Sequence, residues 1–471
     1  MAGLIDRGDL SVTLHRLSRG PLAASGRPVC CDNKKQSRVE RDEPRHRDLS
    51  GLSRPSALAP FRIRNYRFQW PSDLLTSAAF EMETIILGWY VLVQTGSVLL
   101  LTLFASLNYT GTLVAPLFGV LGDRIGHRDL LAVMRASYAM LAATLLTLAL
   151  TGYLNATCVL VIAAFMGLVR PSDLGVRGAL NADIMPQDQL ISSIAVSRTT
   201  QDLARIAGAL SGAGLFAGAG LGPSYVVIVS LYSIATVLML CVRLPLRSRG
   251  GENAAVATPR HSPLHDLKEG VSHVWTSPGM QAGLWIAFLT NLTAYPFTNG
   301  LLPYIAREIY GGNQAVLGYL SAAFAVGSLT GSIILSLLAS RGVGRLMLYT
   351  AAAWYLMLLI FSRMHSIPVA MGCLTLAGIV QSMSMIAIAV ILMQTAGERF
   401  RGRVMGVRML TIYGLPIGLM AAGSLIDAIG FSATVMLYVG VGLTMLTVIA
   451  LHWRASRQRA QAPGVSQPDA V

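Results

Sequence analysis

Long apolar runs recur along this chain, and they restrict it to folds whose surroundings are lipid. Several runs of about 18 or more residues are nearly free of charge, which is the length a helix needs to cross about 30 Å of hydrocarbon. Only 13% of the 471 residues are charged and 53% are hydrophobic, whereas soluble proteins carry about 25% charged residues. The chain is therefore expected to be a polytopic membrane protein with the lipid bilayer as its main partner.

Twelve candidate spans follow one another between residues 70 and 453. Because a segment in lipid must satisfy its own backbone hydrogen bonds, we expect each span to be an α-helix. The predicted fold is thus an all-α membrane protein with twelve transmembrane helices in two six-helix bundles. The approximate bounds are 70–95, 98–121, 130–152, 156–182, 190–219, 223–245, 280–303, 314–339, 345–364, 367–394, 402–428 and 431–453.

The net charge of +14 follows the loops rather than forming a nucleic-acid surface. Basic residues gather in the N-terminal tail, in alternate loops and at the C-terminus, which is the pattern of loops that stay in the cytoplasm. This distribution explains the high pI without a nucleic-acid partner. It predicts a multi-pass protein of the plasma (inner) membrane with both termini cytoplasmic. The basic loops are 124–129, 243–268, 341–345, 399–403 and 454–459.

The longest loop between spans divides the helices six and six, as in transporters built from two halves. Leu264, Leu267, Val271, Val274 and Trp275 recur within it at helical spacing, which predicts an interfacial helix. The polar, Arg-rich N-terminal segment has no periodicity and is expected to be disordered. The predicted divisions are a cytoplasmic tail 1–60, an N-terminal bundle 61–245, a cytoplasmic linker 246–279, a C-terminal bundle 280–455 and a second tail 456–471.

Small residues repeat in the fifth and eleventh spans, which supports that division. The fifth span contains Gly208 and Gly212, and the eleventh contains Gly414, Gly418 and Gly423. Small residues at this spacing let helix backbones approach closely. Close packing and a role in conformational change are both compatible with the pattern.

A short motif lies between the second and third spans. Gly119 and Gly126 permit tight packing and a sharp turn, and Asp123 can pair with an arginine or cap a helix start on the other bundle. The motif also contains Arg124 and Arg128. It resembles the cytoplasmic loop signature of the major facilitator superfamily, and this resemblance implies that Gly119, Asp123, Arg124, Gly126 and Arg128 form a cytoplasmic gate motif.

Further segments narrow the resemblance to one branch of that family. Residues 61–67, Gly88 with Trp89, and residues 401–405 are similar to the enterobactin-exporter-like group, over roughly residues 61–455. The resemblance implies proton-coupled efflux of siderophores, drugs or related small molecules. One departure weakens the antiport inference: antiporters often have a Gly-Pro pair in span 5, and here Ala209 follows Gly208.

Ionisable side chains at membrane depth are costly and are therefore candidates for function. Arg170, Asp173 and Arg177 share one face of span 4, and Arg198, Asp202 and Arg205 share one face of span 5, each with an acid between two arginines. We expect both aspartates to stay ionised, and Arg135, Arg177 and Arg198 to snorkel toward the cytoplasmic surface. The candidates for proton coupling or the substrate pathway are Glu81, Glu83, Arg170, Asp173, Asp202 and Arg205.

Glu81 and Glu83 in span 1 are two residues apart, about 200° around a helix, so they cannot both face one cavity. We expect one to point toward the pathway and the other toward a neighbouring helix. Either is a candidate proton-coupling group, because an apolar site favours the protonated carboxyl. The alternative is a structural ion pair with Arg170 or Arg205.

Pro171 should kink span 4 and break its hydrogen-bond ladder near Gly167. The stretch 170–173 is therefore a candidate substrate or coupling site, or else a salt-bridge cluster joining spans 4 and 5. Other polar groups able to line a pathway are Asn108, Tyr109, Asn291, Tyr295, Asn299, Gln381 and Gln394.

No phosphate-binding loop or catalytic metal motif occurs, and the five cysteines have no metal spacing. We therefore expect no enzyme activity, no cofactor and no metal. The predicted function is proton-driven export of a small-molecule substrate by alternating access, by a monomer. A facilitator-type importer of a small metabolite and a non-transporting membrane receptor or scaffold remain alternatives.

Overall fold

Helices account for nearly all of the described chain, as expected for a backbone that must satisfy its hydrogen bonds away from water. The computed structural model describes residues 59–112, 114–243, 263–337 and 342–461, and no strand occurs within these ranges. Nearly all of the expected N-terminal tail and half of the linker, residues 246–262, lie outside the described residues.

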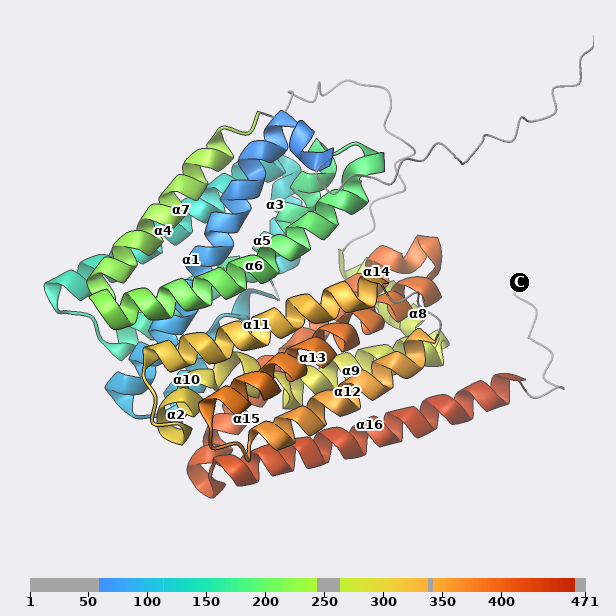
Figure 1. Cartoon of the computed structure of the whole chain (residues 1–471). Helices are drawn as coiled ribbons and strands as arrows, with labels where there is room; N and C mark the ends of the chain where they lie inside the picture. The colour runs from blue at the N-terminus through green and yellow to red at the C-terminus, as the bar shows by residue number, and fades with distance from the viewer. Residues whose placement is uncertain (1–58, 113, 244–262, 338–341, 462–471) are drawn as a thin grey trace, which may run out of the picture. The chain divides into compact units, whose positions relative to one another are not determined.

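The first half of the chain forms α1 to α7 (Figure 1). A 3₁₀ turn, η2 (Ala59–Arg62), precedes α1, and another, η3 (Thr110–Thr112), separates α2 from α3. The helices are α1 (Arg64–Thr95), α2 (Val98–Leu107), α3 (Ala115–Ile125), α4 (His127–Thr151), α5 (Ala156–Ile184), α6 (Gln187–Ala219) and α7 (Leu221–Leu240).

The second half begins with a short helix and then forms the remaining spans. Its first span is interrupted by two π-helical turns, η4 and η5, around the short α10. The elements are α8 (Pro263–Thr276), α9 (Pro278–Thr293), η4 (Pro296–Gly300), α10 (Leu302–Tyr304), η5 (Ile305–Ile309), α11 (Gln314–Leu337), α12 (Val343–Phe361), α13 (Ile367–Thr395), α14 (Gly397–Leu410), η6 (Thr411–Tyr413), α15 (Gly414–Ile429) and α16 (Phe431–Gln461).

Twelve spans result, and the prediction of two six-helix bundles is confirmed. Within the described ranges, 8 spans are long and apolar enough by composition alone, and the bent segment from α2 to α3 makes a ninth. The other three are α1 and α6, which hold the membrane-depth charges, and the interrupted segment from α9 to η5. One detail of the prediction is wrong: the second span is not continuous, because it bends by 53° between Thr112 and Leu117.

Within each half, glycines let one pair of helices pack closely, and the two pairs occupy corresponding positions in the halves. A Cβ at Gly208 would lie 2.7 Å from the carbonyl oxygen of Ala78, so α6 packs directly on α1. A Cβ at Gly414 would lie 2.7 Å from the carbonyl oxygen of Phe288, so α15 packs on α9 in the same way. The small residues of the fifth and eleventh spans therefore serve close packing, in equivalent positions of the two halves.

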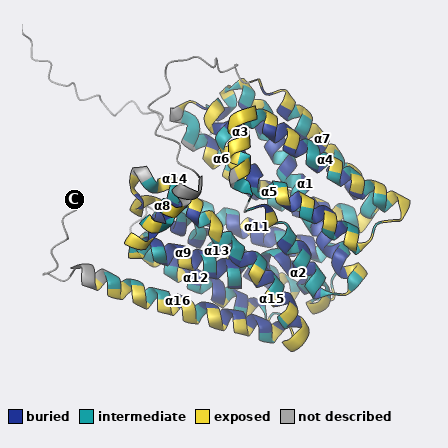
Figure 2. Cartoon of the chain, turned by 180° about the vertical axis from the view of Figure 1, so that it is seen from behind, coloured by how far each residue is buried: buried dark blue, intermediate teal, exposed yellow. Residues whose placement is uncertain are grey.

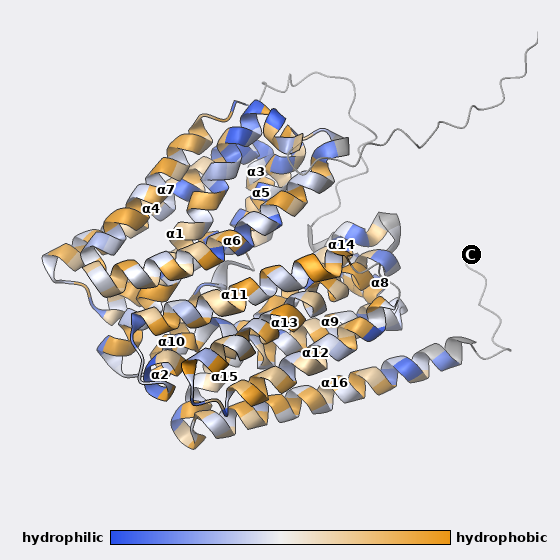
Figure 3. Ribbon diagram, in the orientation of Figure 1, coloured by the Kyte–Doolittle hydropathy of each residue, from blue (hydrophilic) through white to orange (hydrophobic). Residues whose placement is uncertain are grey.

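The turns define two ends of the helices. The basic end contains the turns at Gly126, Pro186, Gly342 and Ala396, and the far end contains those at residues 96, 152, 220, 311 and 430. Gly126 has a φ of 96°, a conformation that side chains other than glycine rarely adopt. Hydrophilic residues gather at α8, at α14 and at the end of α16, whereas hydrophobic residues cover much of α7, α12 and α13 (Figure 3).

The two bundles contact each other through residues near the far end. A Cβ at Gly423 of α15 would lie 3.2 Å from the Cα of Leu99 in α2. Nη1 of Arg307 donates to the carbonyl oxygen of Leu92 at 3.0 Å. At the basic end, by contrast, α3 packs against α4 and α5 of its own bundle, and many of its residues are exposed (Figure 2).

The helix α8 packs against α14 at the basic end. Glu269 forms an ion pair of 3.1 Å with Arg403, and the rings of His273 and Phe400 stack with centroids 4.1 Å apart. Val274 is buried among these residues, whereas Trp275 is exposed. α8 thus lies where the sequence predicts an interfacial helix.

Candidate transport site

Two neighbouring cavities hold most of the ionisable side chains at membrane depth. The first has a volume of about 90 Å³ and is lined by both bundles: by α1, α2 and α6, and by η4, α10, α11 and Leu419. The second has a volume of about 280 Å³ and is lined by α1, α4, α5, α6 and α7. Phe80, Glu81 and Arg205 line both cavities and stand at their junction.

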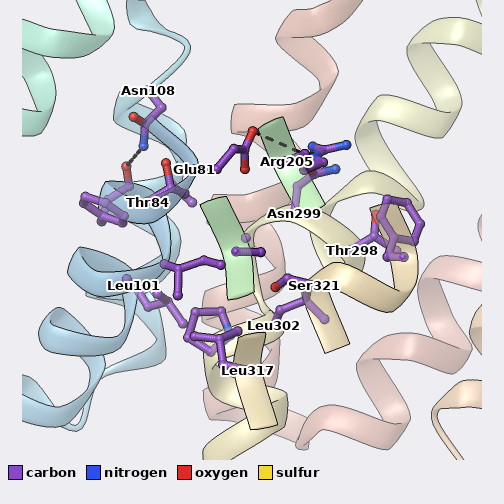
Figure 4. A pocket seen from close by; sticks show the side chains of 18 of the residues that line it. Glu81, Thr84, Leu101, Asn108, Arg205, Thr298, Asn299, Leu302, Leu317 and Ser321 are labelled. Atoms are coloured by element: carbon purple, nitrogen blue, oxygen red, sulfur yellow. Dashed lines mark hydrogen bonds and ion pairs between the residues drawn. The ribbon is translucent and has the colours of Figure 1, made fainter. Parts of the chain in front are cut away.

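Arg205 connects Glu81 to the second bundle. Its Nε lies 3.8 Å from Oε1 of Glu81, and its Nη2 donates to Oδ1 of Asn299 at 2.8 Å. Figure 4 shows this ion pair beside Asn299. Gly208, one helical turn after Arg205, lets α6 approach α1 closely enough for the ion pair to form. A single guanidinium therefore contacts a carboxylate of one bundle and an amide of the other.

Glu83 lines neither cavity and is buried. Its Oε2 accepts a hydrogen bond of 3.1 Å from the hydroxyl of Tyr232, and its Oε1 accepts one of 3.5 Å from Tyr225. Among the described residues no cation forms an ion pair with it. The two glutamates thus face different surroundings, as their 200° separation requires, and the ion pair with an arginine belongs to Glu81.

Arg170 of α5 forms no ion pair among the described residues, although it interacts electrostatically at longer range with Glu81 and Glu83. Its Nη1 lies 3.3 Å from Oδ1 of Asn108 and 3.5 Å from Oγ1 of Thr84, and its buried Nη2 makes no hydrogen bond. The guanidinium lies over the ring of Phe80, and Arg170 lines the second cavity.

α5 runs as one helix through Pro171, so the proline does not divide span 4 into two helices. A kink with a freed carbonyl near Gly167 stays a prediction. The helix backbone is packed closely on the N-terminal side of the proline: Gly111 packs against the carbonyl oxygens of Gly167 and Leu168, and Gly167 packs against that of Leu107. This close packing sets α5 directly beside α2 and η3.

A buried cluster of charges joins α1, α4 and α5. Asp73 pairs with Arg135 and lies 3.6 Å from Nε of Arg177, which also pairs with Asp173. The side chain of Arg135 is 0% exposed. Snorkelling of Arg135 and Arg177 is therefore a wrong expectation, since a nearby carboxylate turns both side chains inward.

Sequence reasoning missed Asp73, although the chain offers a signal for it. Asp73 and Arg135 each lie nine residues from the turn at the basic end (64 to 73 and 126 to 135), and Arg177 lies eight residues from it (177 to 185). At 1.5 Å per residue, all three are about 12–14 Å from that end. Equal depth on neighbouring helices would have indicated the cluster.

The expected flanking of the two aspartates by arginines holds only in part. Asp173 pairs with Arg177 but not with Arg170. Asp202 is buried and lines the second cavity, yet within the described residues no arginine forms an ion pair with it. Arg198 is exposed and also lines that cavity.

Several contacts of the gate motif lie within the first bundle. Asp123 lies 3.9 Å from Nε2 of His127, and Nδ1 of His127 lies 2.6 Å from Oδ2 of Asp183. Arg128 pairs with Asp129 and donates to the carbonyl oxygen of residue 240 at 2.5 Å. Arg124 is exposed, and a Cβ at Gly119 would meet open space.

Two six-helix halves that enclose charged cavities are the architecture of a secondary transporter. The chain belongs to the Major Facilitator Superfamily, whose sequence model matches residues 71–411 and 284–469. It is thus a multi-pass membrane transporter rather than an enzyme.

Curated relatives include drug exporters. The multidrug efflux pump Tap of Mycolicibacterium fortuitum is 24% identical over 386 residues, which cover 80% of this chain and 93% of that protein. Tap of Mycobacterium tuberculosis is 24% identical over 411 residues, covering 83% of this chain and 94% of that protein.

Solved structures share the fold at low identity. The nucleoside transporter NupG has a TM-score of 0.62 at 12% identity, covering 83% of this chain and 100% of that chain. A bacterial homologue of the lysosomal transporter Spinster, in an inward-facing and unoccupied conformation, has a TM-score of 0.64 at 13% identity, covering 85% of this chain and 99% of that chain. At these identities the likeness establishes the fold alone.

Proposed function

We propose that this transporter exports a small molecule by alternating access, driven by protons that bind Glu81. The observation that carries the proposal is the contact chain from Glu81 through Arg205 to Asn299, which links an ionisable group in a cavity to both bundles. In the proposed orientation the basic end and both termini face the cytoplasm, in the plasma (inner) membrane, and the protein works as a monomer. The relatives named as multidrug efflux pumps support export.

Protonation of Glu81 would change the forces on Arg205. The ionised carboxylate attracts the guanidinium from the side of α1, whereas Asn299 accepts its hydrogen bond from the side of η4. A proton on Glu81 removes the attraction of the first bundle, so the position of Arg205 depends on the charge of Glu81. Because Arg205 also contacts the second bundle, that charge can bias the equilibrium between two arrangements of the bundles.

The bundle contacts indicate which side is open in the observed arrangement. The contacts through Gly423 and Arg307 lie near the far end, and the second cavity extends toward the basic end along Thr76, Arg177 and Arg198. This arrangement supports access from the basic end. Opening the far end would require the contacts of Arg205 and Arg307 across the bundles to break.

Transport by reconstituted vesicles tests the proposal. A fluorescent drug that the intact protein extrudes from an efflux-deficient cell serves as cargo, and an imposed pH gradient should drive its movement. Glu81→Gln should abolish movement driven by the gradient while retaining exchange of cargo at equal pH. Gradient-driven movement equal to that of the unaltered protein would refute the assignment of Glu81.

Two matched controls locate the effect. Glu83→Gln makes the same chemical change on the opposite face of α1 and should leave coupling intact, because Glu83 lines neither cavity. Glu308→Gln makes it at the far end, where the side chain is 48% exposed. The direction of movement under the same gradient separates export from import. If the intact protein extrudes no fluorescent drug from the efflux-deficient cell and moves none in vesicles, a receptor or scaffold is favoured.

A further inference from the structure

The charges around the second cavity do not balance when they are paired by distance. Four arginines and three acidic residues line it. Arg177 pairs with Asp173, and Arg205 pairs with Glu81. Arg170, Arg198 and Asp202 are left without an ion pair among the described residues. Arg198 is exposed, whereas Arg170 lies deep in the bundle.

The guanidinium of Arg170 has unused capacity to bind an anion. It carries five N–H donors and no acceptor. Its two hydrogen bonds, of 3.3 and 3.5 Å to neutral oxygens, are at the long limit for such bonds. Its Nη2 is buried and has no partner. An arginine at this depth is costly unless it is paired or hydrated. An anion in the cavity would therefore bind the guanidinium of Arg170 more strongly than the neutral oxygens of Asn108 and Thr84 do.

Part of the wall of the second cavity is apolar or aromatic and suits such a group on a cargo molecule, while the other ten lining residues are polar or charged. Phe80 lies under the guanidinium, and Met166, Leu174, Tyr138 and Tyr232 line the same cavity. We propose that the cargo is a small apolar or aromatic anion whose carboxylate, or similar planar oxyanion, is held by Arg170. Planar oxyanions match the fork of an arginine with two parallel hydrogen bonds. The inference rests on the proposed function only in placing the cargo in this cavity.

Equilibrium binding without a pH gradient tests the charge preference directly. The probes are dansylglycine, which has a carboxylate, and dansylglycinamide, which has a neutral amide in its place. Fluorescence titration of the purified full chain in lipid nanodiscs should show that the carboxylate binds about tenfold or more tightly. Arg170→Gln should remove most of this preference, and Arg170→Lys should retain part of it, because the charge remains without the fork.

Arg345→Gln controls for net charge, since Arg345 is exposed and lines neither cavity. This variant should keep the full preference. Equal binding of the two probes by the intact protein, or a preference that survives Arg170→Gln, overturns the proposal. Because no gradient is present, a preference that persists in Glu81→Gln separates anion recognition from proton coupling.

A second measurement decides the question if neither probe binds. Leu174 lies one turn from Arg170 and lines the same cavity, so Leu174→Cys can be placed in a chain whose native cysteines are replaced by serine. Two methanethiosulfonate reagents are compared, an anionic one with a sulfonate group and a cationic one with a trimethylammonium group. The reagent ratio, defined as the rate of reaction of the anionic reagent with this cysteine divided by that of the cationic reagent, should be higher when Arg170 is present. A reagent ratio that falls about tenfold in Arg170→Gln supports the proposal, and an unchanged ratio refutes it.

Discussion

Asp73→Asn should strongly destabilise the first bundle. The change keeps the size and an acceptor oxygen of the side chain, and it removes only the negative charge. Arg135, which is 0% exposed and pairs with Asp73, would then be a buried cation without its carboxylate. Arg177 keeps Asp173, so one cation loses its counter-charge.

The expected loss follows from that single unpaired charge. Breaking a buried ion pair by removing one partner costs about 3–5 kcal/mol. Since about 1.4 kcal/mol corresponds to a factor of ten, the ratio of folded to unfolded protein should fall by roughly two to four orders of magnitude. Glu308→Gln provides the matched control: its partner Arg307 is 34% exposed, and such exposed pairs contribute about 0–1 kcal/mol.

Reversible unfolding in mixed micelles, monitored by far-UV circular dichroism, measures the free energy of unfolding for both variants. A double variant with Asp73→Leu and Arg135→Met should recover most of the loss, because replacing a whole buried pair by apolar side chains is often neutral or stabilising. Equal free energies of unfolding for Asp73→Asn and Glu308→Gln would show that the cluster is not a stabilising contact.

Three further changes test the helix contacts. Gly208→Leu should push α6 from α1 and reduce drug transport at least tenfold, because a Cβ at residue 208 would lie 2.7 Å from a backbone oxygen of α1. Gly214→Leu is the control and should transport normally, because a Cβ at residue 214 meets open space. Asn299→Leu removes the acceptor of Arg205 and should slow gradient-driven transport more than exchange at equal pH; equal slowing of both would contradict the bridging role. Gly423→Val should weaken the contact of α15 with α2 and raise labelling of a cysteine placed at the far end, and unchanged labelling would show that this contact does not close that end.

The sequence predicts the spans better than it predicts their contacts. Hydropathy locates helices because a lipid environment selects apolar residues at every outward position, and the prediction succeeds even where charges interrupt α1 and α6. The bend in the second span was missed, yet the polar run Asn108–Thr112, followed by Pro116, is typical of a helix boundary. For the position of the helix boundary, this local signal is a better guide than the mean hydropathy of the whole segment.

The contacts of the candidate site depend on helix rotation and depth, which a hydropathy pattern does not specify. The offset of about 200° around the helix shows that Glu81 and Glu83 face different directions. Only the packing of α1 on α6 and α7 determines which of them faces the cavity. Snorkelling is expected for Arg135 from the sequence because it lies near the cytoplasmic end of its span. Its partner, Asp73, comes from another helix at equal depth. The side chain of Arg135 therefore pairs with this carboxylate and does not extend to the membrane surface.

The two kinds of ion pair in the first bundle differ in burial, and this difference separates their roles. Asp73 and Arg135 are 10% and 0% exposed, so breaking that contact leaves a charge with no solvent to receive it. Glu81 and Arg205 are 23% and 30% exposed and 3.8 Å apart, so a proton or a cargo molecule can reach Glu81 and the attraction can be lost at modest cost. A group that must gain and release a proton in each transport cycle needs the second environment, and a group that joins three helices needs the first. Asp73 therefore suits a structural role, and Glu81 suits the coupling role proposed for it.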